Sequence, residues 1–386
     1  MKKSLFAIAA VTAFAGAAQA QSSVTVYGIL DVGFASGYAK NGATKTTNNL
    51  FDQSRSTSSR LGFRGTEDLG GGLSAFFTIE TGLTPQGSNF SGVNNRQSFV
   101  GLRSKGMGAV SIGNQYTVEH NAIVATDPGA SNNVTGSIIR PAGPVTDSGQ
   151  GTLSNAYVVQ STNMIIANSD TFAGFRGNAM YVSNGTDTTQ SASGTTNATN
   201  GGNTNYSGWG LSADYTWKKL YVTAAYQSFK NVNDNGVQTL TAAQIAAGAS
   251  AGVTGATLPN TTDNGTYVGA TYDFGVLKAF AGWIDRKVTS NVASNNYLKR
   301  TGQQIGVRSF ITPKIEGWAS GGNGRYDAFG PTSPTANFVA WQLGSNYYLS
   351  KRTNLYGIYG VTQTSSTSAT SASAASQFAV GVRHTF

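Results

Sequence analysis

Histidine and cysteine are the residues most often used for covalent and metal chemistry, and this chain offers few of them. It contains no cysteine and only two histidines, His120 and His384. A hydrolase needs a nucleophile beside a base, and neither histidine has an evident triad partner. By alternation, His384 shares a face with apolar residues of its strand, which suggests an interface. Since thiolates, a ligand cluster and a phosphate-binding loop are all missing from the sequence, it predicts no catalytic residue, no metal and no cofactor.

Arginine is the residue whose spacing does suggest a function. Arg60 and Arg64 alternate with Leu61 and Phe63, so a strand here has a charged face and an apolar face. A charge facing lipid at the bilayer midplane costs about 2–4 kcal/mol, so in a membrane barrel these arginines would face the lumen. Arg96 shares the face of Ser98, opposite Phe99, and is also expected in the lumen.

The elements that would position these arginines are half-apolar strands. Segments with period-two alternation are joined by very short turns at one end, and by low-complexity connections near 38–56, 183–206, 231–264, 321–335 and 362–376 at the other. Short turns on one side and long loops on the other are typical of outer-membrane barrels. The sequence therefore predicts an all-β fold, a transmembrane antiparallel barrel of about 16 strands, with the count least certain across 155–182.

The C-terminal strand fits the same class. Phe378, Val380, Val382, His384 and Phe386 recur at period two, and the sequence stops on the aromatic residue. Such an ending is the assembly signal of outer-membrane barrels, so Phe386 is expected to serve assembly by the barrel-assembly machinery. An ordinary sandwich strand is the alternative explanation of this segment alone.

The N-terminal segment predicts that the protein is exported. A basic start, an apolar stretch from Leu5 to Ala15 and Ala18-Gln19-Ala20 form a signal peptide, expected to be cleaved after residue 20. Residues 21–386 would then be one barrel domain. The formal charge of +9 falls to +7 because Lys2 and Lys3 leave with the signal. Scattered basic residues and export argue against nucleic acid as a partner.

A long connection at 114–153 is expected to fold into the lumen. It shows no clean strand and contains Pro128, Pro141 and Pro144. Structureless stretches of this length inside a compact domain are usually functional or disordered. An external loop is the alternative.

Several motifs now resemble one family. Residues 59–73 (SRLGFRGTEDLGGGL) resemble the second strand of the trimeric general-diffusion porins of Gram-negative outer membranes, β-proteobacterial type. The segments 26–31 (VYGILD), 96–102 (RQSFVGL), 113–117 (GNQYT) and the C-terminal strand are similar to the first strand, the fourth strand, the start of the infolded third loop and the last strand of that family. The resemblance implies a homotrimer with a constriction between wall arginines and acids of the third loop.

The chain departs from that family pattern at some charged positions. A wall arginine of the family falls near Gln160, and an early loop acid falls near Asn121. Asp127 keeps a matching acid and is expected to face the arginine wall, Glu119 is a substitute, and Arg140 could restore positive charge. The expected pore constriction comprises Arg60, Arg64, Arg96, Glu119, Asp127, Arg140 and Gln160.

The expected function is a water-filled channel for passive diffusion of small hydrophilic solutes and ions, mildly anion-selective. The expected setting is the outer membrane, in contact with its lipids and lipopolysaccharide. A substrate-specific anion channel and an adhesin or structural barrel are the alternatives. On this view Asp127→Asn raises anion selectivity and Arg60→Ala lowers it.

Overall fold

A computed structural model describes residues 23–87, 96–141, 156–188, 202–233, 261–291, 296–329, 335–367 and 371–386. The predicted signal peptide lies outside these residues and stays a prediction. The described chain is almost wholly strand, and its strands are β1 Ser23–Asn41, β2 Thr44–Gln53, β3 Arg60–Gly70, β4 Leu73–Gly82, β5 Gln97–Ser104, β6 Gly108–Tyr116, β7 Gln160–Ser169, β8 Phe175–Thr188, β9 Gly202–Trp217, β10 Leu220–Asn233, β11 Thr261–Asp273, β12 Lys278–Ser290, β13 Tyr297–Thr312, β14 Ile315–Phe329, β15 Thr335–Tyr348, β16 Thr353–Thr364 and β17 Ser373–Thr385.

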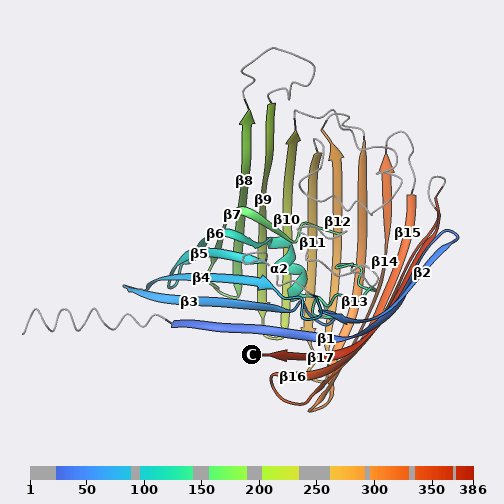
Figure 1. Ribbon diagram of the computed structural model, residues 1–386. Coiled ribbons are helices and arrows are strands. Elements are labelled where there is room, and N and C mark those ends of the chain that lie inside the picture. Colours follow the sequence, from blue (N-terminus) through green and yellow to red (C-terminus); the bar gives the residue numbers. More distant parts are fainter. Residues whose placement is uncertain are drawn as a thin grey trace, which may run out of the picture.

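The sheet closes into a barrel (Figure 1). From β3 to β17 each strand pairs antiparallel with the next, and β1 pairs with β17 from Ile29 to Asn41. The other edge of β1 pairs with β3 over residues 23–29 and with β2 over residues 32–41. Because β2 and β3 follow one another along the same edge, they occupy the place of one interrupted strand. The barrel therefore has 16 strand positions, which confirms the predicted fold class.

Two of the predicted connections need correction, and the one expected at 321–335 is mostly strand because β14 runs to Phe329. The connection expected at 38–56 is mostly strand, since β1 runs to Asn41 and β2 returns from Thr44 after a two-residue turn. Its polar composition hid the strands, because residues exposed on both faces show no apolar alternation. The interruption lies after β2, where the Asp31 carboxylate accepts hydrogen bonds from the backbone of Ser56 and Thr57 at 2.8 and 2.7 Å. These bonds hold the bent segment 54–59 against the barrel wall.

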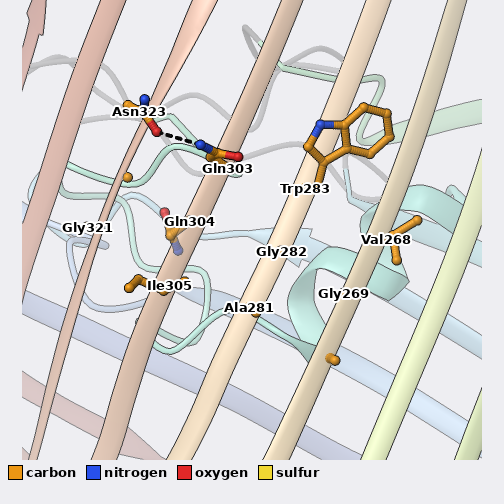
Figure 2. A pocket seen from close by; sticks show the side chains of 12 residues that line it. Val268, Gly269, Ala281, Gly282, Trp283, Gln303, Gln304, Ile305, Gly321 and Asn323 are labelled. Carbon is orange, nitrogen blue, oxygen red and sulfur yellow. Dashed lines mark hydrogen bonds between the residues drawn. The ribbon is translucent and has the colours of Figure 1, made fainter.

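Alternation separates an outer and an inner face. Val100, Leu102 and Ile112 are all more than half exposed and project outward from neighbouring positions of β5 and β6. On the far wall, Figure 2 looks at the outer surface of β11–β14, from which Val268, Trp283 and Ile305 project while the helix α2, Val118–Ala125, lies behind the sheet. These side chains border a shallow groove of about 540 Å³. The outer wall is thus the apolar one.

The connection after β6 folds into the barrel, as predicted. Thr117 caps α2 by accepting a hydrogen bond from the backbone of His120 at 3.2 Å. Thr126 then meets the hydroxyl of Tyr267 on β11 at 2.6 Å, and Arg308 on β13 donates to the carbonyl of Pro128 at 2.9 Å. We call residues 117–140 the inner loop; residues 142–153 of the predicted connection lie outside the described residues. In the described part of the chain, no helix has the length and apolarity needed to cross a bilayer.

Phe386 completes the barrel seam. Its backbone N–H and C=O exchange hydrogen bonds with Gly28 of β1, both at 3.1 Å. A Cβ built on Gly28 would meet the Phe386 ring and would lie 2.7 Å from the Arg60 carbonyl oxygen. The aromatic ring therefore packs where a glycine leaves room for it.

Candidate functional site

Two arginines and one glutamate form the charged centre of the inner wall. Arg96 donates from Nε to Glu80 at 2.5 Å, and an Arg60 guanidinium nitrogen lies 3.6 Å from the other Glu80 oxygen. The Tyr27 hydroxyl donates to the same oxygen at 3.2 Å, and Arg96 also donates to the Tyr116 hydroxyl. Two guanidinium groups thus share one carboxylate, which leaves the cluster with a net positive charge.

Arg60 is positioned by the bend that precedes β3. Its Nε donates to the Ser58 carbonyl at 3.0 Å, and a terminal nitrogen lies 3.3 Å from the Thr57 hydroxyl. Both acceptors belong to the segment that Asp31 holds in place. The local sequence of β3 thereby presents Arg60 toward the lumen, with Leu61 and Phe63 on the other face, as the alternation predicts.

The side chain of Arg96 also enters this cluster, but not for the reason that the sequence alternation suggested. In the β4–β5 and β5–β6 registers, Ser98 pairs with Ile79 and Asn114 and shares the outer face of Val100. Phe99, which packs edge-on to Phe76, therefore lies on the inner face, so the parity argument for Arg96 was wrong. Arg96 precedes the strand, and its buried side chain turns inward to Glu80.

The inner loop adds a third arginine. Arg140 donates to the Asn132 carbonyl at 2.6 Å and to the Asn133 side chain at 2.9 Å. These acceptors are neutral, and in the described chain Arg140 forms no ion pair with a carboxylate within 4.0 Å. Its charge is therefore not paired directly, although it lowers the pKa of the Asp127 carboxyl at longer range.

His120, on α2, is buried between two tyrosines and lies within the electrostatic influence of these arginines. Its ring centroid is 4.4 Å from that of Tyr116 and 5.8 Å from that of Tyr157, whose hydroxyl lies 3.2 Å from His120 Nδ1. Burial first, and then the charges of Arg140, Arg96 and Arg60, hold the pKa of His120 well below its usual value. The imidazole is therefore neutral at pH 7. Contacts of Asn133 place Arg140 near Arg60, because Asn133 accepts from Arg140 and donates to the Ser58 hydroxyl at 3.3 Å, while the Ser58 carbonyl accepts from Arg60.

The Asp127 carboxylate does not face Arg60 and Arg96, which corrects the expectation from the sequence. Its carboxylate accepts from the backbone of Ser131 at 2.7 Å and of Gly129 at 3.4 Å, and from the Gln304 amide on β13 at 3.4 Å. Burial raises its pKa despite these bonds. The contacts turn this acid toward the β13 wall, where it closes a turn of its own loop.

The Glu119 side chain of α2 is buried against the wall formed by β11 and β12. In the described residues neither carboxyl oxygen has a hydrogen-bond partner, and a Cβ on Gly265 would collide with it. Burial first, and then the charge of Asp263, raise the pKa of Glu119 well above its usual value, although Arg286 opposes this. The two loop acids are thus both held on the side away from Arg60 and Arg96.

The two remaining predicted residues lie on the inner wall at different places. Gln160 is buried at the start of β7 and pairs with Tyr116, which places it beside the arginine cluster. Arg64 is exposed four residues beyond Arg60 on the same face of β3, with its guanidinium carbon 5.3 Å from the centre of the Tyr27 ring. Arg64 therefore lies outside the cluster.

Glu80 is the residue that the sequence analysis missed. It shares the face of Ser74 and Thr78, so period-two alternation places it on the polar face, but only the pairing of β4 with β3 and β5 brings it to the arginines. Buried pairs on the opposite wall were missed as well, namely Arg286–Asp263 and Arg308–Glu316, both at 2.6 Å. Among the described residues no group of three potential ligands could hold a metal. The arrangement can sort ions by charge.

Comparison with known proteins gives a consistent result. A family model described as Gram-negative porin matches residues 7–367. An outer membrane porin protein of Bordetella pertussis is 27% identical, with 100% of both chains covered. Outer membrane porin protein 32 of Delftia acidovorans is 43% identical over 33% of this chain and 35% of its own length. Among solved structures, an anion-selective porin from Comamonas acidovorans superposes with a TM-score of 0.66 at 22% identity, covering 95% of this chain and 100% of that one.

Proposed function

This chain belongs to the Gram-negative porin family and forms a water-filled channel in the outer membrane, and we propose that this channel prefers anions mildly. The family and the fold are those of channels and not of enzymes. One observation carries the preference: Arg60 and Arg96 share Glu80, Arg140 is joined to the same segment through Asn133 and Ser58, and Glu80 is the only carboxylate paired to the three arginines in the described chain. Glu119 and Asp127 support the same sign, because both are buried and, in the described residues, neither forms an ion pair with these arginines.

The preference is mild because Glu80 cancels one of the guanidinium charges and salt screens the rest. The Debye length is about 10 Å at 0.1 M and about 3 Å at 1 M, so fixed charges act on passing ions mainly at low salt. Reversal potentials in a KCl gradient across a planar bilayer test the proposal. They should show anion preference at 0.1 M that falls toward none at 1 M, and a cation preference at 0.1 M would refute it.

We propose further that the porin works as a homotrimer. The wall of β4–β6 is built from strands of 8 to 10 residues, whereas β8–β15 have 13 to 16. A membrane-spanning strand needs about 9–11 residues to cross the hydrocarbon core. The strands β4–β6 are about this long, so this wall does not extend beyond the membrane. Such a low wall suits contact with neighbouring copies of the protein. The mass of the detergent-solubilised protein, measured by light scattering, checks the trimer. Contacts with lipopolysaccharide and with the barrel-assembly machinery stay predictions.

A further inference from the structure

A second positively charged place lies on the inner wall, away from the arginine cluster. A cavity of about 330 Å³ is lined by two arginines, Arg64 and Arg103, by the hydroxyl residues Ser23, Thr25, Thr66, Ser74 and Thr78, and by Gly65, Phe76 and Phe77. Arg64 follows Arg60 by four residues along β3, which corresponds to about 13 Å of strand. It lies toward the end of the barrel that carries the short turns. An ion leaving the constriction toward this end therefore passes the cavity.

The charge of the cavity is not balanced from within. No acidic side chain lines it, and in the described chain Arg64 forms no ion pair, its guanidinium lying over the Tyr27 ring. Arg103 is paired to Asp170, so Arg64 supplies the uncompensated charge. A guanidinium offers several N–H donors in a fixed fork, and hydroxyls can donate beside it.

Guanidinium and hydroxyl donors around one cavity match the acceptors of a small oxyanion. Charge-assisted hydrogen bonds to phosphate or carboxylate oxygens are roughly twice as strong as neutral ones. We propose that this cavity is an oxyanion-binding station beyond the constriction, at which small phosphate-like or carboxylate solutes pause during passage. The inference rests on the proposed channel function and adds a discrete binding step to it.

Binding at a station differs measurably from long-range attraction. A bound ion must leave before the next can take its place, so the current saturates with concentration, whereas attraction alone produces no half-saturating concentration. The test is single-channel conductance against inorganic phosphate concentration at pH 7, with chloride as the second arm. We expect phosphate conductance to saturate in the native porin while chloride conductance does not.

Arg64→Gln should raise the half-saturating phosphate concentration about fivefold, as expected for loss of one charged donor at an exposed site. The matched control is Arg383→Gln. Arg383 also lies on the inner face and donates to Asn354 at 2.9 Å, so its removal subtracts the same charge from the lumen outside the cavity. Arg383→Gln should leave the half-saturating concentration unchanged, and Arg64→Lys should restore part of the saturation.

The proposal is overturned if native and Arg64→Gln porins saturate alike, if phosphate conductance does not saturate, or if Arg383→Gln weakens saturation as much. Circular dichroism and oligomer mass should match the native porin for each variant compared. A cation-preferring reversal potential would instead refute the proposed anion preference. The two failures are therefore distinguishable, because one concerns the sign of selectivity and the other the concentration dependence.

Discussion

Replacing Glu80 by glutamine should raise anion selectivity. Glu80 lies between Arg60 and Arg96 and is the carboxylate that both of them contact. Glutamine keeps an acceptor for Arg96 and a partner for Tyr27 but removes the negative charge. The net charge of the cluster therefore rises by one unit.

The size of the effect follows from Coulomb's law. A unit charge about 7 Å from a passing ion contributes about 0.6 kcal/mol at the dielectric constant of water. Screening at 0.1 M salt reduces this to about 0.3 kcal/mol. Since anions are enriched and cations depleted by the same factor, the permeability ratio should rise about threefold at 0.1 M, and only about 1.2-fold at 1 M.

Reversal potentials in KCl gradients at both salt levels provide the measurement. Glu67→Gln is the matched control, because Glu67 is exposed on the outer face of β3 and its loss changes the same charge outside the lumen. An unchanged ratio in a folded Glu80→Gln porin at 0.1 M, or an equal rise in the Glu67→Gln control, would refute the assignment of Glu80 to the ion path.

Three further predictions concern the inner loop and the seam. Burial raises the pKa of Glu119, so docking of the inner loop should weaken as the pH rises above about 4.5 toward that raised pKa. Glu119→Gln removes this titrating group. The variant should therefore strengthen the hydrogen-exchange protection of residues 118–125 by about 1 kcal/mol at pH 8 and by little at pH 4. No difference between the two pH values would contradict it. The pKa of His120 is lowered, so the hydrogen-exchange protection of the same residues should fall as the pH drops below about 6.5, after correction for intrinsic exchange. His120→Phe should abolish this fall. The same fall in the variant would show that another group titrates. Gly28→Val should sharply reduce the yield of folded barrel in a detergent refolding assay, because its side chain would collide with the Phe386 ring and the Arg60 carbonyl, and a native yield would show that the seam adapts.

Strand alternation made part of this site predictable from sequence. The faces of Arg60 and Arg64 follow from period two, because one apolar face must meet the membrane. Arg96 shows the limit of the rule: it precedes its strand, so alternation does not apply to it. Glu80 needed the register between β3 and β4, in which it pairs with Gly62, and a single sequence does not fix register.

The inner loop was predictable as a feature and not in its detail. Length and prolines indicated that residues 114–153 are unusual, and the loop does fold inward. The direction of Asp127 depends on Gln304, 177 residues away, and an irregular segment has no period from which such contacts could be inferred. The bend at 54–59 likewise depends on Asp31, which lies 25 residues before Ser56 in the chain.

The distribution of acids changes how this pore sorts solutes. A transverse field requires positive charge on one side of the constriction and negative charge on the other. Here the loop acids Glu119 and Asp127 are buried against β11–β13, while the same loop brings Arg140 toward Arg60 and Arg96. The loop therefore adds positive charge on the side where a transverse field would need negative charge. Since Glu80 cancels only part of this charge, an ion at this point meets a net positive charge, and the net charge of a solute should decide its passage more than the orientation of its dipole.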